Sequence, residues 1–347
     1  MKVLIADFLF AEAHRDVNTN FIYAFTNIGD IDVVSLNGYY EKQRAEFEER
    51  NIKLLNITKK RRTGKLGSRL FSLSLMKDTA FYINNASYDA IVCLGFETVF
   101  FGLGLVEIRG VPILLFHHKN TDELRSLIKR LAFNTYKNKV YHIVFENFFK
   151  NRLVNEIGVL NENVYVVPHP AKIYDTNGIS EKYDCVAISN SNDEDFISEA
   201  IIRENEFLQH GLHILFRSKT KEKEGAVEVI KGFMEKEKYD ELIMEGKTIF
   251  VPLPKTFVYR LSASIYDALS RKKTVFTTSK YYADEYEKRY PGICRYVETV
   301  DQLIEELGKD RNTNLSSIQR FLEEHSIDAA SVCINQIMRE LSTKARR

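Results

Sequence analysis

The sequence predicts an α/β protein with two doubly wound domains. Its 347 residues exceed what one hydrophobic core usually serves, and a hydrophobic content of 44% with 12% aromatic residues is enough for two cores. Short runs of Val, Ile, Leu and Phe alternate with helical patterns along the chain. Such runs are typical of parallel strands covered on both faces, and their alternation with helices is typical of βαβ units. The alternation is interrupted once, at 168–183, where two prolines and few large apolar residues occur.

The first half, residues 1–170, is expected to form one doubly wound domain. Its strands are short runs of β-branched or other apolar residues. Asn18 or Thr19 is a suitable N-cap for the helix that follows the first strand. The expected strands are 3–6, 31–36, 52–57, 89–94, 113–116, 142–145 and 165–167, and the expected helices are 18–27 and 66–84.

Residues 171–183 are predicted to be a linker, after which 184–325 repeat the pattern as a second domain. The expected strands are 185–188, 213–216, 248–251 and 274–276, and the expected helices are 194–208, 227–236, 260–269 and 301–307. In the last segment, 326–347, apolar residues from Ile327 to Leu341 recur at helical spacing, which predicts an amphipathic closing helix. Two halves of this kind suggest a central cleft, because ligands in doubly wound sheets bind beyond the carboxyl ends of the strands.

Composition excludes several classes of function. The net charge of +1 creates no field that would attract nucleic acid. The four cysteines are scattered and form no CxxC pair, so neither a disulfide framework nor a zinc site is indicated, and a reducing cytoplasm fits best. The opening residues MKVLIADFLF are typical of a strand, because Asp7 interrupts the apolar run too early for a signal peptide. No apolar run approaches the roughly 20 residues of a spanning helix.

Histidines follow two of the expected strands in the first half. The strand in VPILLFHHK runs directly into His117 and His118, at the end where such sheets place their sites. A neutral imidazole there could bind a substrate hydroxyl or take its proton. The alternative is that one ring points into the core and the other to solvent, since neighbours on an extended chain face opposite ways. His169, between Pro168 and Pro170, is either a ligand contact or part of a rigid hinge.

Small polar and basic residues follow two strands in the second half. Ser189, Asn190, Ser191 and Asn192 stand where a strand leads into a helix, which suits a phosphate but also an ordinary N-cap. Arg217 and Lys219 end the next strand and could neutralise a diphosphate, or they are solvated surface charges. The two observations support each other only if the two strands are neighbours.

A third group of polar residues surrounds the helix expected at 260–269. Asp267 lies within this helix and could accept two hydrogen bonds from a ribose diol. Alternatively, it pairs only with Arg260 or Arg271. The polar residues of the preceding loop and helix start are Lys255, Tyr259, Arg260, Ser262 and Ser264.

Three stretches carry a resemblance to a known family. GVPILLFHHK resembles a strand that ends in histidine, HIVFENFFKNRLVNEIGVLNENVYVVPHPA resembles a strand–helix–strand unit, and IYDALSRKKTVFTTS resembles the run lyEAmacGkPVvaT. All three occur in the GT-B glycosyltransferases, and the chain is most similar to the retaining enzymes of family 4. The resemblance spans most of the chain and implies two Rossmann-like domains that face a central cleft, with 1–170 on the acceptor side and 184–325 binding the nucleotide sugar.

The resemblance also implies roles for individual residues. Asp267 stands at the family's ribose-binding Glu, His118 or His117 at a histidine near the donor sugar, and Arg217 with Lys219 near the donor diphosphate. A UDP- or GDP-linked sugar is then the substrate, with no further cofactor and no metal, and a glycan or lipid-linked molecule is the acceptor in surface polysaccharide or glycoconjugate synthesis.

The sequence departs from the family at four positions or segments. The first Glu of the family's Glu-x7-Glu pair falls on Tyr259, its glycine on Lys272 and its proline on Thr274. FLFAEAHRD replaces the glycine-rich turn after the first strand. These departures favour an alternative reading, a catalytically inactive binding subunit of an active transferase. A sugar-nucleotide epimerase is a third reading, which needs a carboxylate and a histidine across the cleft, with Glu97 and His118 as candidates.

A basic segment precedes the helix expected at 66–84. It contains Lys59, Lys60, Arg61 and Arg62, and leucines with Phe71 follow within the same stretch. Such a segment could rest on an anionic membrane surface, which would make a cytoplasmic protein peripheral on the inner face of the membrane. The alternative is a solvated basic loop before a packed helix.

Overall fold

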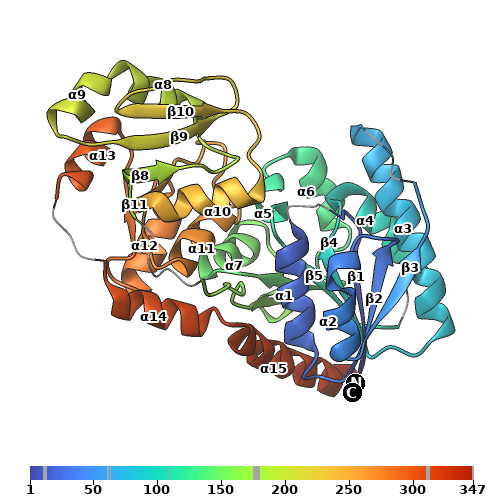
Figure 1. Ribbon diagram of the computed structural model, residues 1–347. Helices are drawn as coiled ribbons and strands as arrows, with labels where there is room; N and C mark the ends of the chain where they lie inside the picture. Colours follow the sequence, from blue (N-terminus) through green and yellow to red (C-terminus); the bar gives the residue numbers. More distant parts are fainter. Residues whose placement is uncertain are drawn as a thin grey trace. The chain divides into compact units, whose positions relative to one another are not determined.

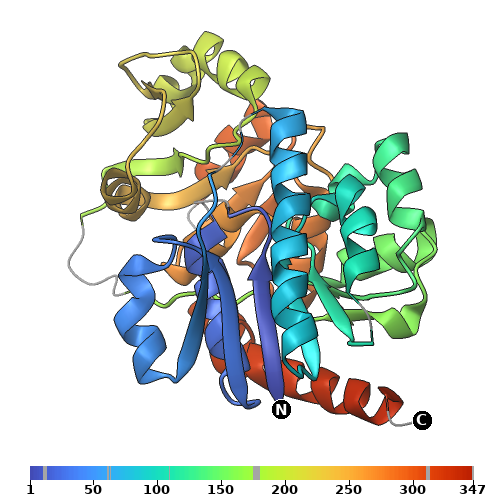
Figure 2. The ribbon, with the colours of Figure 1, turned by 90° about the vertical axis from the view of Figure 1, so that its right-hand side faces the viewer.

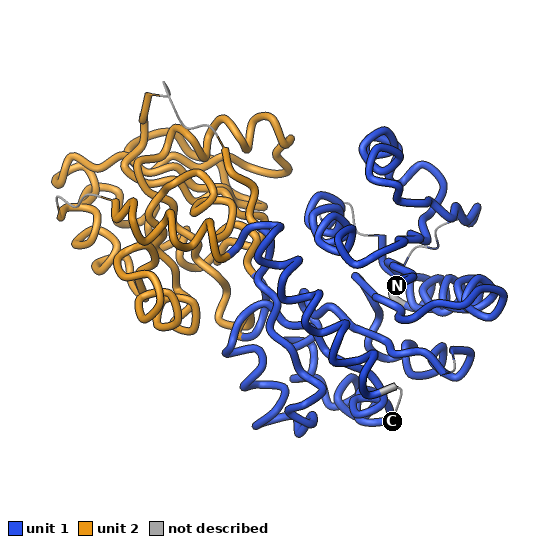
Figure 3. Tube along the Cα trace, turned by 90° about the horizontal axis from the view of Figure 1, so that it is seen from below, with its two compact units in different colours: residues 1–170, 259–261, 325–347 blue, residues 171–258, 262–324 orange. Residues whose placement is uncertain are grey.

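The computed structural model describes residues 1–10, 14–60, 62, 64–108, 110–174, 180–309 and 313–345. The chain divides into two compact units, coloured separately in Figure 3. Unit 1 comprises Met1–Pro170, Tyr259–Leu261 and His325–Arg347, and unit 2 comprises Ala171–Val258 and Ser262–Glu324. Each unit contains one sheet with helices against it, which confirms the predicted α/β class.

The sheet of unit 1 has the order β3-β2-β1-β4-β5-β6-β7, and all its paired strands are parallel. Its order reverses between β1 and β4, so ligand sites are expected near the carboxyl ends of these central strands. The strands are β1 Lys2–Asp7, β2 Asp30–Leu36, β3 Ile52–Ile57, β4 Ala90–Gly95, β5 Ile113–Phe116, β6 Tyr141–Val144 and β7 Val164–Val166.

The helices of unit 1 form two groups (Figure 1). Helix α3 packs on α4, and α4 packs on α6, whereas α1 packs on the C-terminal helix α15. Figure 2 shows α15 passing the start of β1, where Ser342 Oγ lies 3.8 Å from Met1 Sδ. The helices are α1 Arg15–Phe25, α2 Arg44–Glu49, α3 Lys65–Asn85, α4 Thr98–Gly104, α5 Asn120–Glu123, α6 Leu127–Asn134, α7 Asn147–Asn151 and α15 Ile327–Ala345. Short 3-10 turns lie at Glu41–Gln43, Leu105–Glu107 and Asn161–Asn163, and Arg152–Glu156 forms a π-helical turn.

The sheet of unit 2 has the order β10-β9-β8-β11-β12-β13, again with parallel pairs throughout the named strands. Its order reverses between β8 and β11. The strands are β8 Tyr183–Ala187, β9 Ile214–Ser218, β10 Val227–Lys231, β11 Gly246–Val251, β12 Thr274–Thr277 and β13 Cys294–Tyr296. The helices are α8 Glu194–Ile202, α9 Glu204–Gln209, α10 Lys236–Glu245, α11 Ala263–Ser270, α12 Lys280–Arg289, α13 Val300–Leu307 and α14 Leu315–Glu324.

Two expected elements of unit 2 differ in the structure. The helix predicted at 227–236 is wrong, because Val227–Lys231 forms strand β10. Val227 and Val229 are buried while Glu228 between them is not, which is the period of two that a strand requires. The helix predicted at 194–208 is two helices, α8 and α9, separated at Arg203.

The core of unit 2 forms where the apolar strands meet α8 and α13. Phe216 of β9 and Phe250 of β11 pack there with Ile197 of α8 and Leu303 of α13. This core lies behind the strand ends that carry the polar residues described below. Among the described residues, no helix is both long enough and apolar enough to cross a membrane.

Candidate functional site

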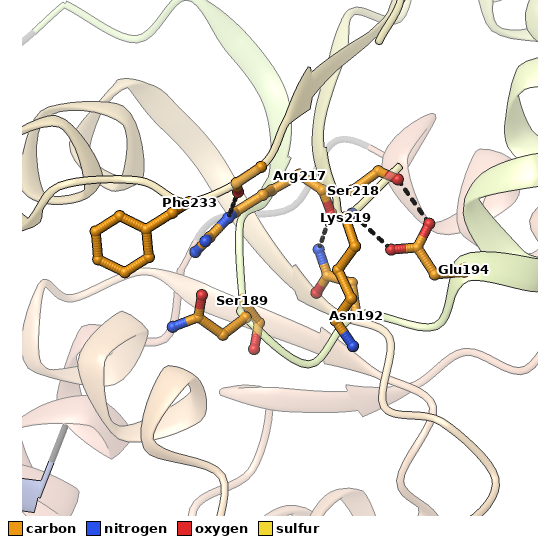
Figure 4. Close-up of a pocket in the computed structure, with 9 residues that line it drawn as sticks. Ser189, Asn192, Glu194, Arg217, Ser218, Lys219 and Phe233 are labelled. Carbon is orange, nitrogen blue, oxygen red and sulfur yellow. Dashed lines mark hydrogen bonds between the residues drawn. The ribbon is translucent and has the colours of Figure 1, made fainter. Parts of the chain in front are cut away.

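A pocket of about 210 Å³ opens at the carboxyl ends of β8 and β9 in unit 2. The two strands are neighbours in the sheet, with Ala187 paired to Phe216, so the two predicted groups of polar residues lie side by side. Figure 4 shows the pocket with its lining side chains. The residues that line it are Ser189, Asn190, Asn192, Glu194, Arg217, Ser218, Lys219, Gly232 and Phe233.

Arg217 is the most informative side chain in this pocket. Only 7% of it is exposed, and no carboxylate pairs with it among the residues that the structure describes. Its Nε donates to Gly232 O at 2.7 Å, and its guanidinium carbon lies 5.8 Å from the centre of the Phe233 ring (Figure 4). Burial lowers the pKa of Arg217, and the neighbouring Tyr239 raises it. A desolvated cation without an anionic partner is costly, so this site is suited to an anionic ligand.

Asn192 and Glu194 hold the two strand ends together. Asn192 Nδ2 donates to Ala187 O at 2.6 Å and to Arg217 O at 3.0 Å, so it bridges β8 and β9. Its buried Oδ1 has no partner among the described residues and can accept from a ligand. Glu194 accepts from Ser218 Oγ at 2.6 Å and from the Lys219 N–H at 2.8 Å. Although burial raises the pKa of Glu194, these bonds and the Lys221 ammonium bring it below its usual value.

Phe233 is a pocket residue that the sequence analysis missed. It is 78% exposed and follows Gly232, whose φ of 93° turns the chain just after β10. The signal was a glycine followed by an aromatic residue, and it was hidden because this stretch was expected to be helical. A flat, exposed ring beside a cation and amides offers a surface for stacking.

Asp267 does not line this pocket, but Tyr239 interacts with both Asp267 and the pocket residue Arg217. Tyr239 Oη donates to Asp267 Oδ2 at 3.3 Å, and the same phenol influences Arg217. Arg271 lies 3.6 Å from Asp267 Oδ1, so the ion pair expected as the alternative is present. The side chain of Asp267 stays 39% exposed, which leaves it accessible to a ligand. The pKa of Asp267 is raised, because the effect of burial outweighs the attraction of Arg271.

The other residues predicted for donor binding are not brought into the pocket. Lys255 is exposed in the loop after β11, and the Ser262 N–H, at the start of α11, donates to Tyr282 Oη at 3.0 Å. Tyr259 and Arg260 belong to unit 1, where Thr121 Oγ1 donates to Tyr259 O at 2.6 Å.

Unit 1 gathers histidines at the ends of its strands. His117 faces inward: its Nε2 lies 2.9 Å from His142 Nδ1, and His142 Nε2 lies 2.7 Å from Lys137 O. His118 instead stacks on His14, with ring centres 4.8 Å apart, and its Nε2 has no partner among the described residues. Burial lowers the pKa of both His117 and His118, so both are neutral at physiological pH.

His14 is a second residue that the sequence analysis missed. Its pKa is lowered to about 4 by burial and by the nearby charges of Lys119 and Arg260, so it is a neutral base at pH 7. Unlike His118 it is only partly buried. The signal was its place in the segment after the first strand, where the family has a glycine-rich turn.

Asp7 shapes the turn after β1 without a glycine-rich sequence. Its Oδ1 accepts from the N–H groups of Leu9 and Phe10 at 2.8 and 3.0 Å, and its Oδ2 accepts from Asn18 Nδ2 at 2.9 Å. Gly95 permits this arrangement, because a Cβ there would lie 2.4 Å from Asp7 Oδ1. A carboxylate therefore ties β1 to α1 ahead of His14; residues 11–13 lie outside the described part of the chain.

The remaining candidates have structural partners. Glu97 caps α4 through the N–H groups of Val99 and Phe100 and lies 3.1 Å from Arg69 Nε, and both Glu97 and His118 belong to unit 1. His169 is 3% exposed, with its ring edge-on to Phe21 and Phe145.

The basic segment before α3 has one partnered lysine. Lys59 pairs with Asp78 at 2.5 Å, Lys60 and Arg62 are exposed, and Arg61 lies outside the described residues. Within the described ranges, no group of three or more His, Cys, Asp and Glu residues is arranged to hold a metal ion.

No family model matches the sequence, and no curated protein matches it. Solved structures do match over nearly the whole chain. A UDP-N-acetylglucosamine 2-epimerase from Rickettsia bellii has a TM-score of 0.64 at 12% identity, with 100% of this chain and 98% of that one covered. A glycosyltransferase from Rickettsia africae has a TM-score of 0.62 at 10% identity, with 98% of each chain covered. UGT89C1 of Arabidopsis thaliana, complexed with UDP-L-rhamnose, has a TM-score of 0.62 at 9% identity, covering 98% and 99%.

These likenesses show the fold. Parallel sheets of 7 and 6 strands, each with helices against it, match the two Rossmann-like domains of GT-B proteins. The fold expectation drawn from the sequence is confirmed at the level of the two α/β units.

Proposed function

We propose that this protein is a glycosyltransferase that moves a sugar from a nucleotide-sugar donor to a glycan or lipid-linked acceptor. The observation that carries the proposal is Arg217, a buried cation without a carboxylate partner in the described chain, at the end of two neighbouring strands. The fold supports it, since UGT89C1, with a similar fold, is complexed with UDP-L-rhamnose. The family-4 resemblance favours a retaining, metal-independent hexosyltransferase in surface polysaccharide or glycoconjugate synthesis.

Unit 2 is proposed to bind the nucleotide part of the donor. Arg217 and Lys219 would neutralise the diphosphate, and the free Oδ1 of Asn192 would accept from a ligand N–H or O–H. Asp267 would accept from the ribose hydroxyls with its partly exposed carboxylate, which contacts Tyr239 and Arg271. The nucleotide sugar, UDP- or GDP-linked, is a substrate in this proposal, and no further cofactor is required.

Unit 1 is proposed to act on the transferred sugar and its acceptor through His118 and His14. Both imidazoles are neutral at pH 7, so each can accept a hydrogen bond or a proton from a hydroxyl. His117 faces the core and contacts His142. We propose that this contact fixes the chain at the end of β5 and so positions the next residue, His118. Positive groups around the diphosphate would stabilise the charge that develops on the leaving group.

Isothermal titration with UDP, GDP and their sugars tests donor binding. Replacement Arg217→Gln should weaken nucleotide binding by at least about tenfold, because hydrogen bonds to a charged group contribute roughly 1.5–3 kcal/mol. Arg203→Gln is the matched control, since Arg203 lies outside the pocket and pairs with Glu206 and Asp301. The proposal fails if no nucleotide binds to the wild type, or if Arg217→Gln binds as well as Arg203→Gln.

A donor panel read out by nucleotide release tests catalysis. Replacement of His14 or His118 by Gln should lower the release rate by about 10² or more while nucleotide binding persists, as expected for a group that handles a proton. Nucleotide binding without release for every donor would instead favour the inactive binding subunit. A changed sugar on an intact nucleotide would favour an epimerase.

The acceptor is proposed to arrive at the cytoplasmic face of a membrane as a lipid-linked sugar. Lys60 and Arg62 remain exposed beside the paired Lys59 and could contribute to attraction by anionic lipid. Charge removal, Lys60→Gln with Arg62→Gln, should then reduce binding to anionic vesicles in a flotation assay.

A further inference from the structure

Helix α6 of unit 1 exposes an aliphatic surface that no other part of the described chain covers. Leu127 and Ile128 are each 70% exposed, and Leu131 is 59% exposed. With 3.6 residues per turn, positions i, i+1 and i+4 lie on one face, so the three side chains form one apolar stripe. On α4, which packs against α6, Leu103 is 61% exposed, and Val106 of the 3-10 turn that follows α4 is 65% exposed.

The opposite face of α6 is anchored, so the stripe cannot turn inward. Phe133 is fully buried, and Tyr136 Oη, just past the helix, donates to Thr98 O at 2.9 Å on α4. Gly102 of α4 lies close to Tyr136, because a Cβ at Gly102 would be 3.0 Å from the Tyr136 ring. The outer stripe is therefore a second apolar face on a helix whose inner face is already used.

The segment that carries the stripe is rich in cations, two of which, Arg125 and Lys129, lie near Asp122 and Glu123 just before α6. Residues 125–139 contain Arg125, Lys129, Arg130, Lys137 and Lys139 and no Asp or Glu. Arg130 and Lys137 bond only to main-chain carbonyl groups, of Glu156 and Ile157, and are not paired with a carboxylate in the described part of the chain. Lys129 is the cation neutralised most directly, by Glu123 at 2.8 Å.

We infer that the outer face of α6 docks on an anionic membrane surface. Aliphatic side chains flanked by cations match the boundary between acyl chains and negatively charged headgroups. A stable protein partner is less well matched, since specific interfaces bury about 1,200 Å² or more and this stripe lies on one short helix, Leu127–Asn134. The surface is distinct from residues 59–62, and docking there does not require that the protein transfers sugar.

Co-sedimentation with vesicles tests the inference. The wild-type chain should bind vesicles of phosphatidylcholine containing about a third phosphatidylglycerol more tightly than phosphatidylcholine alone. Leu127→Ser with Ile128→Ser should lower binding to the anionic vesicles at least about tenfold, because two exposed aliphatic side chains no longer enter the interface. Arg130→Gln with Lys137→Gln should reduce the preference for anionic vesicles and make binding less sensitive to salt.

A matched pair in unit 2 serves as the control. Ile202 and Leu208 are 82% and 58% exposed on or beside helices with acidic neighbours, and their replacement by Ser should leave vesicle binding unchanged. Equal loss in both double variants, or no vesicle binding by the wild type, would overturn the inference. Self-association that Leu127→Ser abolishes would overturn it too, in favour of an interface between copies. Nucleotide titration of each variant keeps this outcome separate from the proposed function.

Discussion

Lys272 has a backbone conformation that a lysine rarely adopts. Its φ is 58°, in the left-handed region, in the turn between the end of α11 at Ser270 and the start of β12 at Thr274. The family that the sequence resembles has glycine at this position, and the turn explains why. Here a lysine occupies a turn that glycine adopts without strain.

Replacement Lys272→Gly should raise the free energy of unfolding by up to about 1 kcal/mol, because glycine removes the strain of the left-handed conformation. Asn51→Gly is the control: Asn51 also has a positive φ, of 56°, but asparagine tolerates it, so the gain should be smaller. Urea unfolding of both variants measures the difference. A destabilised Lys272→Gly variant would show that the lysine side chain contributes more than its backbone costs.

The turn between β1 and α1 shows how one residue can define the geometry of a whole element. Asp7 accepts two main-chain N–H groups and the Asn18 amide while only 4% exposed. Replacement Asp7→Ala should lower the free energy of unfolding by about 2–4 kcal/mol, since it leaves buried donors unpaired. Thermal and urea unfolding measure it, and Asp184→Ala, at a partly buried strand position, provides a milder control. A loss no larger than in the control would argue against the role assigned to Asp7.

Ile113–Phe116 can be predicted because it is a continuous apolar run, and its predicted bounds match the structure. The predicted bounds of Ile52–Ile57 also match, although Lys53 and Asn56 interrupt its apolar residues. Val227–Lys231 was predicted to be helical, because a period of two over only five residues does not distinguish a strand from the start of a helix. The polar residues at the ends of β8 and β9 could be predicted, because ligand sites in doubly wound sheets lie beyond the carboxyl ends of the strands. Phe233 and His14 were not, because their positions depend on a turn and on a loop contact between distant segments.

Tyr259 and Arg260 were predicted to bind the donor, but they do not belong to unit 2. Their place beside a helix of the second half suggested a role in donor binding. The structure assigns them to unit 1, where the Tyr259 N–H donates to Asp122 Oδ1 at 3.3 Å. No local pattern in the sequence distinguishes a segment that packs with its neighbours in sequence from one that packs elsewhere.

At the scale of the molecule, the buried histidines predict sensitivity to acid. Burial lowers the pKa of His142 to about 4 and of His169 to about 3, and it also lowers those of His117 and His118. Above pH 6.5 these groups are neutral in both the folded and the unfolded chain, so they do not change the free energy of unfolding. As the pH falls from 6.5 towards 4, only the unfolded chain gains protons, so folding is progressively disfavoured.

Urea unfolding at a series of pH values checks this expectation. The free energy of unfolding should fall by up to about 1.4 kcal/mol per pH unit for each such histidine below pH 6.5. His142→Gln should make the dependence shallower, whereas His210→Gln, at an exposed position, should not. A stability that stays level down to about pH 4 would contradict the assignment of these imidazoles as buried and neutral.

The division of the chain has a consequence for biosynthesis. Residues 325–347 return to unit 1, where α15 packs on α1 and Asn27 Nδ2 donates to Ser331 Oγ at 3.2 Å. As the ribosome proceeds from the N-terminus, the first 170 residues emerge without the helix that covers α1. All of unit 2 must be translated before that helix arrives. Until then, the apolar face of α1 that α15 covers stays exposed in the nascent chain, and during this interval the first domain most needs a chaperone.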